Sequence, residues 1–144
     1  MTLRNSRHLI LVALAALVVG CSSPPPPATP MTFDTFNVQA NNDKQISLEG
    51  YMRLPVAAMV SDTMLVDLYD NPDGKGKAVP VSIYVGSGKN QVEKPPKDYT
   101  DKDFKLHAND GSLVTMKDKV RVSGKLIYSP SSSIFYKPID IQKI

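Results

Sequence analysis

Hydrophobic and polar residues alternate with a period of two over most of the chain after residue 43. In residues 46–54 the predicted buried side consists of Ile46, Leu48, Gly50, Met52 and Leu54. The same alternation returns at residues 64–69, 79–85, 120–128 and 135–143. A period of two is typical of a β-strand with one buried face, and the chain has no amphipathic helical pattern longer than three turns. The sequence therefore predicts an all-β domain with five main strands.

The order of these segments resembles the OB-fold family. DKVRVSGKLIY (residues 118–128), followed by a Ser-rich loop and KPIDIQKI (residues 137–144), resembles the last two strands of that fold. ISLEGYMRL (residues 46–54) resembles its curved first strand, in which Gly50 would allow the bend. The resemblance implies a small five-stranded OB-like barrel. Two departures from that fold are a Pro-rich segment where the usual helix between the third and fourth strands would lie, and an extra hairpin at residues 108–112, through Asp110–Gly111. A small Greek-key sandwich is the alternative fold.

The N-terminus carries an unbroken apolar run at residues 9–19, behind two arginines. The run is shorter than the roughly 20 residues of a membrane-spanning helix, and it fits the apolar core of a secretory signal. VVGC at residues 18–21 resembles the lipobox of bacterial lipoproteins. This resemblance implies that the signal is cut before Cys21 and that the sulfur of Cys21 carries a diacylglyceryl group. Two acyl chains anchor a protein stably in a membrane, whereas one does so marginally.

The lipobox resemblance also divides the chain and predicts its location. We expect a signal peptide at residues 1–20, a lipidated Cys21 with a Pro-rich linker at residues 21–42, and an OB-like domain at residues 43–144. The four consecutive prolines of the linker favour a stiff, extended polyproline II conformation. Ser22 stands where an Asp would imply retention in the inner membrane. The resemblance therefore implies an outer-membrane anchor facing the periplasm, or the outer surface of a single membrane.

Few residues of the mature chain are candidates for catalysis or metal binding. Two of the 17 basic residues leave with the signal, so 15 basic residues face 14 acidic ones, and little attraction to nucleic acid remains. One histidine, His107, is left, and its place beside a predicted hairpin favours a structural role. Asp67, Asp70 and Asp73 do not match a calcium loop, because Tyr69 occupies the first ligand position. We therefore expect no enzymatic activity, no metal and no cofactor.

A set of outward-facing residues on the first three predicted strands forms a candidate ligand face. Its members are Tyr51, Arg53, Asp67, Tyr69 and Tyr84. In OB barrels this outer surface, between the first and fourth loops, is the usual ligand platform. Aromatic rings there can stack on sugars, bases or partner side chains. Alternatively, the tyrosines only shield the sheet as cross-strand pairs, since tyrosine is common in strands.

These observations lead to two hypotheses about function. The first is a non-catalytic, membrane-tethered binding or scaffolding protein whose barrel contacts an envelope protein or glycan. The second is an enzyme or enzyme accessory acting on envelope glycan, with carboxylates such as Glu49 and Asp67 set about 5–9 Å apart across a cleft. Binding of single-stranded nucleic acid follows from the fold resemblance alone, and both export and the near-neutral charge count against it.

Overall fold

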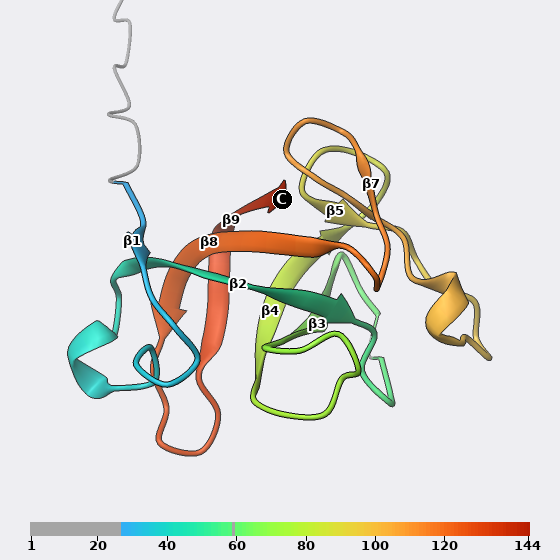
Figure 1. Ribbon diagram of the computed structural model, residues 1–144. Coiled ribbons are helices and arrows are strands. Elements are labelled where there is room, and N and C mark those ends of the chain that lie inside the picture. Colours follow the sequence, from blue (N-terminus) through green and yellow to red (C-terminus); the bar gives the residue numbers. More distant parts are fainter. Residues whose placement is uncertain (1–26, 59) are drawn as a thin grey trace, which may run out of the picture.

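The computed structural model describes residues 27–58 and 60–144 as an assembly of nine strands and two short 3-10 helices (Figure 1). The strands are β1 (Thr29–Pro30), β2 (Gln45–Arg53), β3 (Thr63–Tyr69), β4 (Ala78–Val85), β5 (Gln91–Val92), β6 (Leu106–His107), β7 (Leu113–Val114), β8 (Lys119–Ile127) and β9 (Ile134–Lys143). The helices are η1 (Gln39–Asn41) and η2 (Asp101–Asp103). Within the part of the chain that the structure describes, no helix has the length and apolar character needed to cross a membrane.

Five of the strands close into a barrel. Strand β2 pairs with β8 through residues 45–51 and with β3 through residues 51–53, both antiparallel. Strands β3 and β4 form one further antiparallel ladder, and β8 and β9 form another. The circle is closed by β4 and β9, which run parallel and pair at Val81 and Phe135. The first long strand thus pairs with the second and fourth, and the third with the fifth, as in an OB fold. The predicted OB-like barrel is confirmed, and the sandwich alternative is wrong.

The exchange of partners along β2 depends on Gly50. A Cβ atom at this position would lie 2.2 Å from the carbonyl oxygen of Tyr69, which is closer than real Cβ contacts come. Only glycine therefore lets the end of β3 approach β2 at the place where β2 leaves β8. This is the bend that the sequence pattern predicted for the first strand.

The barrel interior is filled by the residues that the alternation placed on the buried side. The largest fully buried side chains include Ile46, Leu48, Met52, Leu68, Ile83, Leu126, Phe135 and Ile141. The segment between β4 and β8 adds Val92, Phe104, Leu106 and Val114 to this core. Its hairpin, β6–β7, occurs where the sequence predicted it, and a helical turn, η2, precedes the hairpin. This irregular segment thus covers core residues in the place where OB folds usually have a helix.

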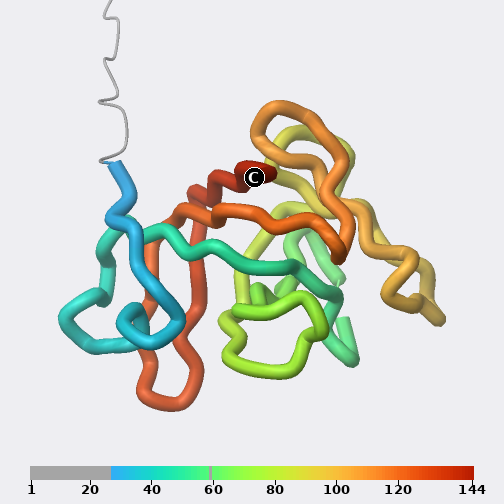
Figure 2. The backbone as a smooth tube through the Cα atoms, in the orientation of Figure 1, coloured from blue at the N-terminus to red at the C-terminus, as the bar shows by residue number. Residues whose placement is uncertain are grey.

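The folded domain begins before residue 43, the boundary that the sequence predicted. Strand β1 pairs parallel with β2, and the amide of Met31 donates to the carbonyl of Ser47 at 2.9 Å. Phe36 is buried in the core cluster, and the buried side chain of Asn41 donates to the Phe36 carbonyl at 2.9 Å. We call residues 27–42 the lead segment; Figure 2 shows it in blue and cyan against one side of the barrel. The predicted signal peptide and Cys21 lie outside the described residues.

Candidate functional site

The structure divides the predicted ligand face into two parts. Tyr51 lies directly opposite Tyr69, and Arg53 lies opposite Asp67, on the neighbouring strands β2 and β3. Tyr84 lies near the other end of β4, six residues beyond the residue of β4 that faces Tyr69. At a rise of about 3.3 Å per residue, this separation is roughly 20 Å. The five residues therefore do not form one compact site.

Arg53 is occupied by contacts within the protein. Its Nη1 donates to the carboxylate of Asp101 in η2 at 3.1 Å, and its Nη2 donates to the carbonyl of Pro72 in the β3–β4 turn. Gly74, with φ +71°, passes over the same side chain, and a Cβ atom there would lie 2.8 Å from the Arg53 Cδ and Nε. Arg53 thus ties the turn and η2 to the barrel, and its guanidinium group does not face open solvent as a ligand-binding group would.

Asp67 lines a hollow of about 200 Å³ on the outer side of β3 and β4, which we call the Asp67 hollow. Its other lining residues are Pro55, Ala57, Leu65 and Pro80. Burial among these mostly apolar residues raises the pKa of the Asp67 carboxyl. No ion pair of residues 27–58 and 60–144 includes Asp67. The hollow is therefore apolar with one uncompensated acid, a combination that is typical of ligand sites.

Tyr84 lines a second hollow, of about 220 Å³, at the seam between β4 and β9, which we call the Tyr84 hollow. It also includes Ser82, Lys89, Asn90, Gln91 and Lys137. Tyr84 is 49 % exposed, and the Nζ of Lys137 stands 3.8 Å from the centre of its ring. The sequence singled out Tyr84, but it gave no sign of Lys137, because that lysine comes from a strand 53 residues later in the chain.

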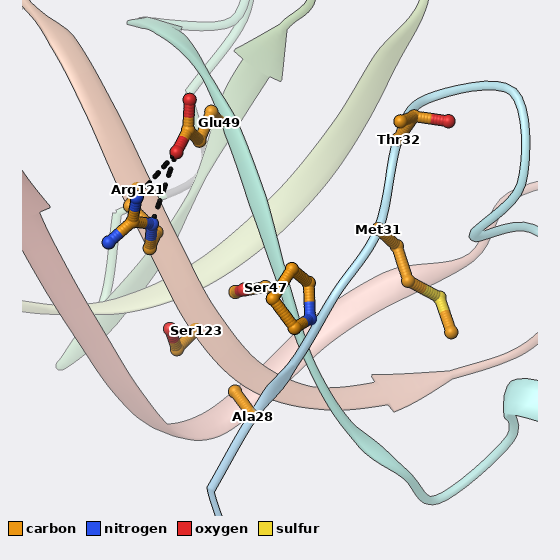
Figure 3. A pocket seen from close by; sticks show the side chains of 8 residues that line it. Ala28, Met31, Thr32, Ser47, Glu49, Arg121 and Ser123 are labelled. Atoms are coloured by element: carbon orange, nitrogen blue, oxygen red, sulfur yellow. Dashed lines mark hydrogen bonds and ion pairs between the residues drawn. The ribbon is translucent and has the colours of Figure 1, made fainter.

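A hollow larger than these two, of about 540 Å³, lies elsewhere, between the lead segment and the outer side of β2 and β8 (Figure 3). Ala28, Pro30, Met31 and Thr32 line one side, and Ser47, Glu49, Arg121 and Ser123 line the other. Glu49 accepts bonds from Arg121 Nη2 at 2.6 Å and from Lys119 Nζ at 3.1 Å. These bonds, the one from Arg121 first, lower the pKa of Glu49. Sequence reasoning missed this hollow because it placed the lead segment in a linker.

The two carboxylates named for a glycan-cleaving reaction are not brought together. Asp67 faces Arg53, which lies four residues beyond Glu49 on β2. Four residues of strand span about 13 Å, whereas the paired carboxylates of glycosidases lie roughly 5–9.5 Å apart. Glu49 is moreover held in its ion pairs with Arg121 and Lys119. The arrangement that the sequence suggested for catalysis is therefore not formed by this pair.

The remaining chemical candidates take structural roles. His107 lies in the β6–β7 hairpin, and its Nε2 stands 3.0 Å from the Glu93 carboxylate. Asp73, in the aspartate-rich turn, accepts a bond from the amide of Lys75 at 2.9 Å, as in an ordinary tight turn. The described residues contain no group of three His, Cys, Asp or Glu side chains that could hold a metal ion.

Comparison with protein-family models, with curated proteins and with solved structures finds no match to this chain.

Proposed function

We propose that this chain is a lipid-anchored, non-catalytic binding protein of the bacterial cell envelope, which presents the outer side of β3 and β4 to a protein or glycan partner. The observation that carries this proposal is the position of Leu65. Its side chain is 45 % exposed and lines the Asp67 hollow. Its cross-strand neighbour, Ser82, lines the Tyr84 hollow. The ladder of β3 and β4 therefore joins the Asp67 hollow to the Tyr84 hollow and carries an exposed apolar side chain between them. Hollows beside exposed apolar side chains are typical of binding surfaces.

The anchoring part of the proposal is supported by the sequence around Cys21. The lipobox-like VVGC motif follows an apolar run of signal-peptide length, and a Pro-rich stretch separates it from the barrel. The chain joins the barrel soon after that stretch, at β1. Mass spectrometry of the membrane-extracted protein tests this part, and a thioether-linked diacylglyceryl group on Cys21 is the expected result. A free thiol, or a mature chain that starts at another residue, would reject the anchor.

An enzyme or enzyme accessory acting on envelope glycan is the second candidate. The observation in its favour is the raised pKa of Asp67 inside a hollow, since a general acid needs a carboxyl that holds its proton. Several other carboxylates lie in ion pairs: Glu49 with Arg121, Glu93 with Lys105, and Asp118 with Lys143. Carboxylates held in ion pairs are poorly placed to act as a second catalytic group, and we therefore favour binding over catalysis.

The binding surface is tested by capture from detergent-solubilised envelopes, with the intact lipoprotein as bait. Leu65→Glu is expected to reduce partner capture at least about tenfold, because it places a charge in the centre of the proposed contact. Leu113→Glu is the matched control, since Leu113 is 44 % exposed on β7, the third strand beyond β4 in the sheet. Both variants should melt at the temperature of the wild type. Equal capture by the two variants would show that the outer side of β3 and β4 is not the contact.

A further inference from the structure

We propose that the Tyr84 hollow binds a sugar that carries a carboxylate group. This inference rests on the proposed function, because it names a ligand class for one part of the outer surface of β3 and β4.

The positive charge of the hollow supports an anionic ligand. Lys137 Nζ lies 3.8 Å from the centre of the Tyr84 ring and 5.8 Å from that of Tyr136. Neither Lys137 nor Lys89 takes part in an ion pair with any described residue. An aromatic face holds an ammonium group in place without neutralising it. The Lys137 charge is thus positioned and still available, and a carboxylate is the group that it would bind.

The neutral groups of the hollow fit a sugar ring. The side-chain oxygen of Asn90 accepts from the amide of Ile141 at 2.8 Å, and that of Gln91 accepts from the amide of Gly88 at 2.8 Å. These bonds fix both amide groups and leave their NH2 ends as donors for hydroxyl oxygens. Tyr84 is 49 % exposed, so its ring offers apolar surface to the C–H face of a pyranose. A simple anion would use none of these groups.

The fold explains why a hollow exists at this place. The ladder between β4 and β9 consists of the single pair Val81 and Phe135. Beyond it, β4 pairs with β5, whereas β9 continues along β8. The two strands therefore separate next to Tyr84, and side chains instead of backbone hydrogen bonds line the space between them. A ligand in the hollow would contact both strands.

The test is a titration of the full ¹⁵N-labelled chain in detergent micelles with N-acetylmuramic acid, followed by chemical shifts. N-acetylglucosamine is the matched probe, because it lacks the lactyl carboxylate. We expect the acidic sugar to bind at least about tenfold more tightly, and to shift the amides of residues 82–85 and 89–91 and those of Lys137 and Ile139. Lys137→Gln should remove this preference, because it deletes the charge and keeps most of the stem. Lys117→Gln, in a different hollow beside Phe104, should leave it unchanged.

Three outcomes would overturn the inference. Equal affinity for the two sugars, or no binding of either, rejects a carboxylate-bearing sugar as the ligand. Unchanged affinity in Lys137→Gln rejects the Tyr84 hollow as the site. Binding of a short Glu-rich peptide as tightly as the acidic sugar shows recognition of carboxylates alone and rejects the sugar. If Leu65-dependent partner capture persists in any of these cases, the proposed binding function stands and only this inference fails.

Discussion

The barrel has two outer surfaces that adjoin where β2 pairs with β3, and they differ in how their polar groups are used. On the surface formed by β2 and β8, Glu49 binds Arg121 and Lys119, and the lead segment lies over this surface. On the surface formed by β3 and β4, Asp67 has no ion-pair partner among the described residues, and Leu65 is exposed. On the first surface the charged groups bind groups of the same chain. On the second surface Asp67 and Leu65 remain free to contact other molecules.

This difference shows that an outward-facing position on a strand does not by itself make a side chain available to a ligand. Arg53 and Asp67 face each other across β2 and β3, yet Arg53 binds Asp101 and the β3–β4 turn while Asp67 lines an open hollow. Which charges find partners depends on loops that arrive from distant parts of the chain. The following predictions test the comparison between the two surfaces, beginning with the largest expected effect.

Phe36→Ala is expected to destabilise the domain by about 3–4 kcal/mol, because it removes a buried ring that anchors the lead segment to the core. Urea denaturation followed by circular dichroism measures this loss. Phe33→Ala serves as the control, since Phe33 is only partly buried and packs edge-on against Phe36; it should cost less. A loss below about 1 kcal/mol for Phe36→Ala would mean that the lead segment is not an integral cover of the β2–β8 surface.

Gly50→Ala is expected to cost about 2–3 kcal/mol, since its methyl group would meet the Tyr69 carbonyl at the place where the two surfaces join. The same denaturation experiment applies. Gly111→Ala is a useful comparison, because its methyl group would meet nothing within 4 Å and only its φ of +88° opposes the change. Its expected cost is about 1 kcal/mol. Equal costs at the two positions would contradict the close approach of β3 to β2.

Glu49→Gln should destabilise the fold by less than about 1 kcal/mol at neutral pH, because its ion pairs lie at the surface. The bonds from Arg121 and Lys119 lower the pKa of Glu49 below its ordinary value of 4.5. The wild type therefore holds this stabilisation above about pH 4.5 and loses it as the pH falls through the lowered pKa. The difference between wild type and variant should disappear at low pH, and a difference that persists there would argue against the ion pairs.

Asp67→Asn should change the free energy of unfolding least of these substitutions, and at neutral pH it should stabilise the domain instead of destabilising it. Burial raises the pKa of Asp67 above its ordinary value of 3.8, so the folded protein binds this proton more tightly than the unfolded chain. The stability of the wild type should consequently fall as the pH rises from about 3.8 through the raised pKa. At pH 7 the Asn variant should be slightly more stable than the wild type, and near pH 3 the two should be equal. A less stable variant at pH 7 would reveal a stabilising partner for the carboxylate, which would remove the contrast with Glu49.

The core could be predicted from the sequence because it depends on local patterns, and the strand order followed from the resemblance to the OB fold. Alternation assigned Leu48, Val66 and Val122 to the interior, and all three are buried. The glycine within the first strand marked the bend, and the Asp110–Gly111 step marked the extra hairpin. Such signals lie within a few residues of the structure that they specify.

The candidate site could be predicted only in part, because it depends on contacts between distant residues. The pairing of Asp101 with Arg53 spans 48 positions, and nothing near Arg53 in the sequence announces it. Phe36 lies in a polar segment without clear alternation, so the sequence did not show whether its side chain is buried or exposed. The alternation of residues identified the tyrosines that point outward. The pairing register of β2, β3 and β4, which the sequence does not show, makes Tyr51 and Tyr69 neighbours and places Tyr84 apart from them.

The single pair that joins β4 to β9 also has a consequence for how the barrel opens. Local opening of a folded protein begins where the fewest backbone hydrogen bonds must break, and this seam is such a place. Amide hydrogens of β4 beside the seam are therefore expected to exchange with solvent faster than those of the long β2–β8 ladder. A ligand that contacts both β4 and β9 would hold the seam closed and slow this exchange. Occupancy of the Tyr84 hollow would then be detectable as resistance of the whole barrel to unfolding.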